Sequence, residues 1–262
     1  MPETRRAGAL TAWGSAYLAG VVSLDDADAS TVGPDALHRV RGVPGEDADV
    51  PVSIALGRLR ARGVTGLRLV LPEPGDPTGL PGPTSFTATA VAAGAAVVTV
   101  GPPEAPAYAL VAARVATAAS GDAVRWDVVP VDFALAPAGL PTLSEADRSL
   151  TETMTASTAE LAALDVARGR DDVAGPLRRL DRALREIDLP PTLTPRAQRL
   201  VATASRLLGV LDIAEETDGA AVTASESLRR SAALRPLRTA TRYALCAAYS
   251  AAAEDGAAAE RR

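Results

Sequence analysis

The sequence predicts an α+β protein in which an N-terminal mixed sheet with packed helices is followed by a C-terminal antiparallel helical bundle. The chain has 262 residues, of which 47% are hydrophobic and 23% charged, so it can bury one large core or two modest ones. The hydrophobic period changes at the Pro/Gly-rich stretch 137–141, with strand-like runs before it and helical periods after it. We therefore expect a sheet-containing region at 1–136 and a helical-bundle region at 143–255.

Three helices are expected in the first region. The stretch 7–22 has apolar side chains at helical spacing, among them Trp13 and Val21, which favours a core-facing helix over an export signal. An acidic cluster at 25–28 is expected to begin a short second helix, because carboxylates favour helix N-termini. The third helix is predicted at 52–62, with Ile54 among its apolar positions.

Strands are expected between and after these helices. Alternation is clearest where Val124, Trp126 and Val128 fall on one face while charged residues fall on the other. The uncharged stretch 77–103 is broken by Gly and Pro, which favours a buried helix–strand unit over a membrane span. The predicted strands are 36–41, 67–71, 95–100, 108–116 and 124–131.

The second region shows helical stripes of Leu and Ala. Ser144 and Asp147 have the spacing of a capping box, and Leu150 and Met154 follow on one helix face. Helices are also predicted at 176–187 and from 195 onwards, and Pro236 is expected to split the last helical segment. Such stripes indicate a closely packed bundle.

Composition excludes several kinds of chemistry. All 27 basic residues are Arg, so the chain can form neither a lysine Schiff base nor a Walker-A phosphate loop. One His and one Cys cannot build a Cys/His zinc site, and a single Cys fits a reducing cytoplasm. We therefore expect no metal, no cofactor and no membrane association, and a cytoplasmic location.

The loop that follows the strand at 67–71 is the first candidate site. Pro and Gly residues give it a defined shape, and it carries the carboxylates Glu73 and Asp76. These carboxylates are candidates to contact a ligand, a cation or a partner. The alternative, which the sequence favours, is a structural turn in which Asp76 satisfies backbone amides.

Three stretches resemble a family of conserved, uncharacterised proteins from high-GC actinobacteria. They are RLVLPEPGDPTGLPGP at 68–83, LDVAR at 164–168 and LRPL at 234–237. The resemblance extends over most of the chain. It implies no activity and transfers no catalytic residue.

A cluster of arginines near the C-terminus is the second candidate site. Arg238 and Arg242 are one helical turn apart, and Arg235 precedes them. Arg side chains bind phosphates and carboxylates through paired hydrogen bonds, so this cluster could hold an anion. The alternative is a solvated helix flank whose charges pair with carboxylates of the same chain.

No residue is predicted to be catalytic. His38 lies in a predicted strand without an accompanying nucleophile motif, so it is interpreted as a half-buried structural residue. Our first hypothesis is a non-catalytic cytoplasmic protein that binds a ligand, a protein partner or a second copy of itself. One alternative is an enzyme that acts on a small anionic substrate through the loop carboxylates and an Arg. Another is a nucleic-acid accessory protein that uses the C-terminal arginines, although the net charge of −5 disfavours nucleic acid.

Overall fold

The computed structural model describes residues 2–77, 79–81, 84–115, 123–132, 140–163, 173–218 and 224–259. The chain divides into two compact units. The sheet unit consists of Pro2–Leu140, Asp188–Thr194 and Tyr249–Arg262, and the helical unit of Pro141–Ile187 and Pro195–Ala248. The limits predicted for two regions, 1–136 and 143–255, stay predictions.

The sheet unit contains a five-stranded mixed sheet in the order β1-β5-β4-β3-β2, so the predicted α+β class is confirmed. β1 runs parallel to β5, and all other neighbours are antiparallel. Every strand end lies within one residue of its predicted position. The strands are β1 (Leu37–Arg41), β2 (Gly66–Val70), β3 (Ala96–Val100), β4 (Ala107–Val115) and β5 (Ala123–Val131).

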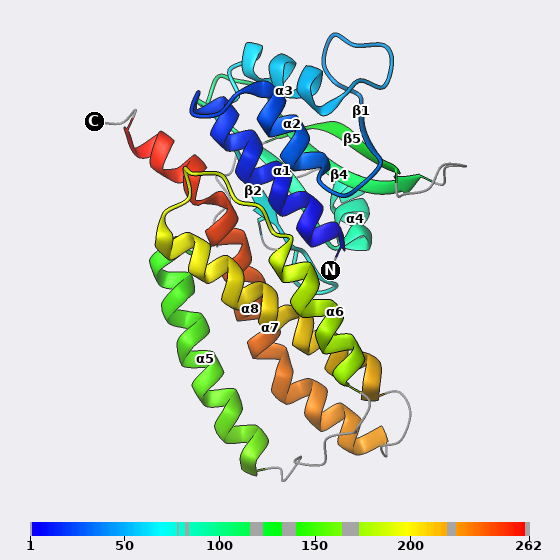
Figure 1. The fold of residues 1–262 in the computed structure, drawn as a ribbon, viewed down its shortest axis with the longest axis vertical. Coiled ribbons are helices and arrows are strands. Elements are labelled where there is room, and N and C mark those ends of the chain that lie inside the picture. The colour runs from blue at the N-terminus through cyan, green and yellow to red at the C-terminus, as the bar shows by residue number, and fades with distance from the viewer. Residues whose placement is uncertain are drawn as a thin grey trace. The chain divides into compact units, whose positions relative to one another are not determined.

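Helices cover both faces of this sheet (Figure 1). On one face lie α1 (Pro2–Leu18), α2 (Leu24–Val32) and α3 (Val52–Ala61), and α4 (Thr84–Ala93) lies on the other. Gly14 allows α1 to lie close to β2, because a Cβ at this position would lie 2.5 Å from the Leu67 side chain. On the opposite face, Phe86 of α4 packs in a cluster with Val70 and Val98. The predicted helix–strand unit at 77–103 is thus confirmed as α4 and β3.

Both edges of the sheet are covered within the sheet unit. The hydroxyl of Ser15 in α1 accepts a hydrogen bond from the Leu67 N–H (2.9 Å) and donates to the Leu67 carbonyl (3.2 Å). Ser250 accepts another from the Leu69 N–H. At the other edge, Val40 exchanges two backbone hydrogen bonds with Val50. Occupied edges protect the sheet from pairing with another chain.

The helical unit confirms the helical C-terminal region. Its helices are α5 (Leu143–Ala163), α6 (Ala174–Arg185), α7 (Pro195–Asp218) and most of α8 (Ala224–Ala259). Successive helices run in opposite directions (Figure 1). The Leu180 side chain of α6 occupies the space left by Gly209 of α7, where a Cβ would lie 2.4 Å from its nearest carbon. α6 is therefore held close to α7.

Two sequence predictions about these helices were wrong. α8 continues through Pro236, where we expected a break. Burial of the adjacent Leu234 and Leu237 offsets the hydrogen bond that proline removes. The capping box of α5 is formed by Thr142 and Glu145, which exchange side chain–backbone hydrogen bonds, two residues before the predicted pair.

Three predicted core positions are exposed instead: Val21, Ile54 and Met154. α1 ends at Leu18, so Val21 lies beyond the helix. In α3 the buried positions begin at Val52, and Ile54 falls on the outer face. Apolar spacing located these helices, although α1 begins five residues and ends four residues before the predicted limits of 7–22. It did not identify every inward side chain.

Candidate functional site

The predicted loop carboxylates lie on either side of a tight turn. The Glu73 N–H donates to the Asp76 carbonyl (3.1 Å), and the Asp76 N–H donates to the Glu73 carbonyl (2.9 Å). Pro74 and Gly75 lie between them, and Gly75 takes the positive φ (86°) that this turn requires. Both carboxylate residues are partly exposed. Their role in binding stays a prediction.

The three predicted C-terminal arginines have different environments. Arg235 is exposed. Arg238 forms ion pairs across to α7, with Asp212 at 2.8 Å and Glu215 at 2.9 Å. Arg242 is only 3% exposed, and its guanidinium lies 5.9 Å from the centroid of the neighbouring Tyr243 ring. The three guanidinium groups therefore do not share one exposed surface.

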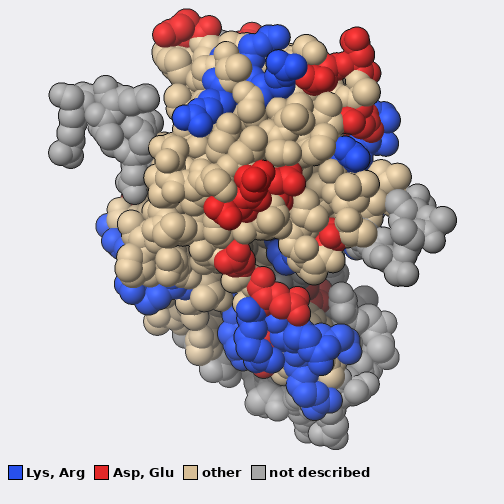
Figure 2. All heavy atoms as spheres, turned by 45° about the horizontal axis from the view of Figure 1, so that its top comes forward, with Lys and Arg blue, Asp and Glu red and all other residues tan. Residues whose placement is uncertain are grey.

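A different set of arginines does share one surface, on α6. We call it the α6 arginine face; it consists of the exposed residues Arg178, Arg179, Arg182 and Arg185. Three of them follow the spacing i, i+4, i+7, which places them on one side of the helix, opposite the buried Leu180. Basic side chains gather in one blue patch in the lower half of Figure 2, over α6.

The charges of this face are not neutralised within the described part of the chain. None of its four guanidinium groups makes an ion pair or hydrogen bond with another residue that the structure describes. Asp181, which lies among them in the sequence, instead pairs with Arg206 of α7 at 2.8 Å. Arg196 similarly pairs with Asp147 of α5. The sequence analysis used α6 only for its Leu stripe, although the Arg spacing was visible there too.

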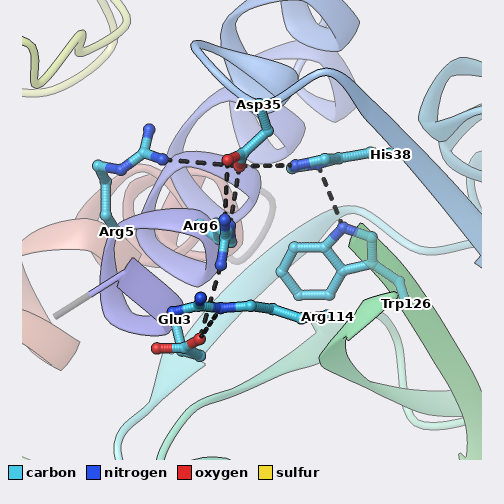
Figure 3. A network of polar contacts seen from close by, with 7 residues as sticks. All are labelled: Glu3, Arg5, Arg6, Asp35, His38, Arg114 and Trp126. Atoms are coloured by element: carbon cyan, nitrogen blue, oxygen red, sulfur yellow. Dashed lines mark hydrogen bonds and ion pairs between the residues drawn. The ribbon is translucent and has the colours of Figure 1, made fainter. Parts of the chain in front are cut away.

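The sheet unit holds a second polar feature, a buried network around Asp35 (Figure 3). Arg6 of α1 donates two hydrogen bonds to the Asp35 carboxylate, both at 2.8 Å, although Arg6 is only 2% exposed. Arg5 adds a cation 3.6 Å away. Burial raises the pKa of Asp35, but the hydrogen bonds from Arg6 and His38 and the charges of Arg6 and Arg5 outweigh it and bring the pKa to about 2. Asp35 is therefore ionised.

His38 of β1 joins this network to the core of the sheet. Its Nε2 lies 3.0 Å from the Asp35 carboxylate, and its Nδ1 lies 3.4 Å from Nε1 of the fully buried Trp126. Because the indole N–H can only donate, Nδ1 must accept and Nε2 must carry the proton. Burial lowers the pKa of His38, more than its contacts with Asp35 raise it. The ring is therefore neutral.

This arrangement resembles the Asp–His pair of a catalytic triad, but the second imidazole nitrogen makes a different contact. In a triad the second imidazole nitrogen faces a nucleophile. Here it faces the Trp126 indole, and His38 is 2% exposed. The network therefore supports the fold, and His38 is fully buried where the sequence predicted a half-buried residue. Among the described residues, no three His, Cys, Asp or Glu side chains are grouped to hold a metal ion.

Acidification is expected to weaken this network in two steps. His38 binds a proton more weakly folded than unfolded, so its contribution to stability is present above its usual pKa of 6.5 and decreases as the pH falls below it. The contribution of Asp35 to stability is present above its usual pKa of 3.8. About 2 kcal/mol of it is lost as the pH falls toward about 2. Urea unfolding from about pH 8 to pH 2 measures both steps.

The variant His38→Gln is the control for the first step, because a glutamine can donate to Asp35 and accept from Trp126 without titrating. We expect it to lose the pH dependence near neutrality and to keep the acidic step. Stability of the unmodified protein that stays constant from about pH 7.5 to pH 5 would contradict the assignment of a neutral His38.

The sheet unit also contains a hollow of about 750 Å³. It is lined by residues of β2, β3, β4 and β5, by the Pro-rich segment 101–106, and by the charged side chains Arg68 and Asp132. Neither Glu73 nor Asp76 lines it. The carboxylates proposed for the enzyme alternative are therefore not part of this hollow.

Family comparisons match nearly the whole chain. The N-terminal domain of the Rv1486c-like protein matches residues 7–142, and the C-terminal domain of the Rv1486c-like protein matches residues 144–246. No curated protein and no solved structure matches. The matched ranges include the turn carboxylates, the α6 arginine face and, of the buried network, Asp35, His38 and Trp126. In the part of the chain that the structure describes, no helix has the length and apolarity needed to cross a bilayer.

Proposed function

This chain belongs to the Rv1486c-like protein family, and we propose that it is a non-catalytic binding protein that recognises an acidic protein partner through the α6 arginine face. The observation that carries the proposal is the set of four exposed guanidinium groups on α6 that make no ion pair with another described residue. Two exposed arginines of α7 differ in this respect, because Arg196 pairs with Asp147 and Arg206 pairs with Asp181.

The fold supports this role by holding the arginines in position. Leu180 fits against Gly209 of α7, so the helix that carries them is anchored from behind. A guanidinium group binds a carboxylate with two parallel hydrogen bonds, and a rigid helix limits the conformational entropy lost on binding. A fixed row of such groups is suited to a partner with several carboxylates.

An acidic protein fits this face better than a nucleic acid does. Arg178 and Arg185 are separated by about 10 Å along the helix axis, which is short for a phosphate-tracking surface. Two Trp, four Tyr and two Phe offer few platforms for base stacking. We commit to a protein partner for these reasons.

The proposal predicts that neutralising the face abolishes binding of an acidic peptide. The test variant is Arg178→Gln with Arg182→Gln and Arg185→Gln, and the probe is a labelled poly-glutamate peptide of roughly ten residues, followed by fluorescence anisotropy. We expect the dissociation constant to rise at least about tenfold, and binding of the unmodified protein to weaken with added salt.

A matched control removes the same number of charges from paired arginines: Arg58→Gln, Arg114→Gln and Arg125→Gln. It should change the dissociation constant by no more than about twofold. An equal effect of both variants, or no peptide binding at all, would contradict the proposal. Tighter binding of a single-stranded oligonucleotide of similar length would favour the nucleic-acid alternative instead. Native mass spectrometry of the free protein would show whether the partner is a second copy.

The cytoplasm remains the proposed compartment, and high-GC actinobacteria the proposed range of the family. The proposed compartment rests on composition, because the chain has one cysteine, Cys246, and so cannot form an intramolecular disulfide. The enzyme alternative has less support, because the described polar network is closed around a neutral His38. The loop carboxylates Glu73 and Asp76 remain candidates for a second contact.

A further inference from the structure

A second charged surface lies on the sheet unit, around α2. We call it the α2 acidic surface; it consists of the exposed residues Asp25, Asp26 and Asp188. Asp26 also starts the helix, because its N–H donates to the Ser23 hydroxyl (3.0 Å) and its carboxylate accepts from that hydroxyl (2.6 Å). None of the three carboxylates makes an ion pair with another residue that the structure describes. Helix initiation therefore explains the position of Asp26 but not the presence of Asp188.

Asp188 is held beside α2 by two hydrogen bonds. The Ser30 hydroxyl donates to its carboxylate (3.0 Å), and the Trp13 indole N–H donates to its backbone carbonyl (3.2 Å). Ser30 follows Asp26 by four residues, so it lies on the same side of α2, about 6 Å further along the helix axis. The carboxylates of Asp26 and Asp188 therefore form a row with the spacing of one helical turn.

The α6 arginine face has the same spacing with the opposite charge. Arg178 and Arg182 are about 6 Å apart along their helix axis, and Arg182 and Arg185 about 4.5 Å. A row of guanidinium groups at this spacing can bind a row of carboxylates with one paired hydrogen bond set per residue. The chain thus carries both an arginine face and an acidic surface that matches it, and neither has an ion pair within the described part of the chain.

From this complementarity we propose that the acidic partner of the α6 arginine face is a second copy of this chain, bound through its α2 acidic surface. This inference rests on the proposed function, because it identifies the partner of the same face. Each copy carries both surfaces, so two copies that exchange the contact form a closed dimer in which the contact occurs twice. Pairing of exposed charges across the contact makes the association sensitive to salt.

The experiment measures dimerisation of the full-length protein by sedimentation velocity at about 0.1 M salt. We expect a dissociation constant in the micromolar range that rises at least about tenfold in about 1 M salt. Arg178→Glu with Arg182→Glu reverses the arginine face, and Asp25→Arg with Asp188→Arg reverses the acidic surface while keeping the capping residue Asp26. Each variant alone should dimerise at least about tenfold more weakly, because like charges then meet in both contacts.

Mixing the two reversed variants is the decisive measurement. In the mixed dimer the unmodified arginine face meets the unmodified acidic surface, and the two reversed surfaces meet each other. Both contacts then join opposite charges again. We therefore expect the mixture to form a heterodimer with a dissociation constant within about threefold of that of the unmodified protein.

Matched controls make the same change of charge outside both surfaces. Arg62→Glu with Arg199→Glu is the control for the reversed arginine face, and Asp47→Arg with Glu104→Arg is the control for the reversed acidic surface; all four residues are exposed. Neither control should change the dissociation constant of the dimer by more than about twofold. Circular dichroism and thermal unfolding check that each variant is folded.

The poly-glutamate peptide separates this inference from the proposed function. The variant with the reversed acidic surface keeps its arginine face, so it should still bind the peptide, and excess peptide should dissociate the unmodified dimer. A protein that binds the peptide but stays monomeric overturns the second copy as partner and leaves the proposed function standing. A protein that does neither overturns both. The inference also fails if the dimer tolerates either reversal or if the two reversed variants do not associate when mixed.

Discussion

Replacing Asp35 by alanine is expected to lower the free energy of unfolding by about 3–5 kcal/mol. The variant leaves the Arg6 guanidinium buried without the carboxylate that receives two of its hydrogen bonds. It also leaves the Nε2–H of His38 without its acceptor. Removing one partner of a buried ion pair costs far more than the pair contributes, because the remaining charge stays out of water. Urea unfolding at neutral pH measures the change.

Two further variants separate this explanation from a general loss of charge. Asp127→Ala removes a carboxylate from a partly exposed pair with Arg125 and should cost at most about 1 kcal/mol. The double variant Arg6→Met with Asp35→Leu removes both buried charges and should recover much of the stability lost in Asp35→Ala. A loss below about 1 kcal/mol in Asp35→Ala would show that the network contributes little to the fold.

The sequence was informative about this fold where the signal is local. The alternation around Trp126 predicted β5, and the structure buries Trp126 completely while Arg125 and Asp127 on the other face pair with each other. Each strand was found because side chains two residues apart share a face. The position of α5 was also correct, but its cap was not, since several Ser, Thr and acidic residues compete there and only backbone geometry selects Thr142.

The buried network could not be predicted, because its members are distant in the sequence. Arg6 and Asp35 are separated by 29 residues, and Trp126 meets His38 only through the parallel pairing of β1 and β5. No spacing rule encodes such a contact. The α6 arginine face is a different case: its i, i+4, i+7 pattern is local and visible in the sequence. The sequence does not show which arginines form ion pairs in the folded chain, as Arg238 does with Asp212.

The second large effect is expected at Gly42, the residue that follows β1. Gly42 has a φ of 75°, and a Cβ there would lie 2.7 Å from the backbone carbonyl oxygen of Val128 in β5. Alanine at this position therefore meets two penalties, the left-handed backbone and a collision with a strand that cannot rotate away. Together they are expected to lower the free energy of unfolding by about 2–5 kcal/mol.

Gly45 in the same loop provides the matched control, because it also has a positive φ (88°) but no atom within 4 Å of an added Cβ. Gly45→Ala should lower the free energy of unfolding only by the cost of the left-handed backbone conformation, about 1–2 kcal/mol. Hydrogen exchange adds a local test: amides of β1 and β5 should exchange faster in Gly42→Ala alone, since the collision pushes these paired strands apart. Equal losses in the two variants would mean that β5 accommodates the methyl group and that backbone conformation alone requires glycine at both positions.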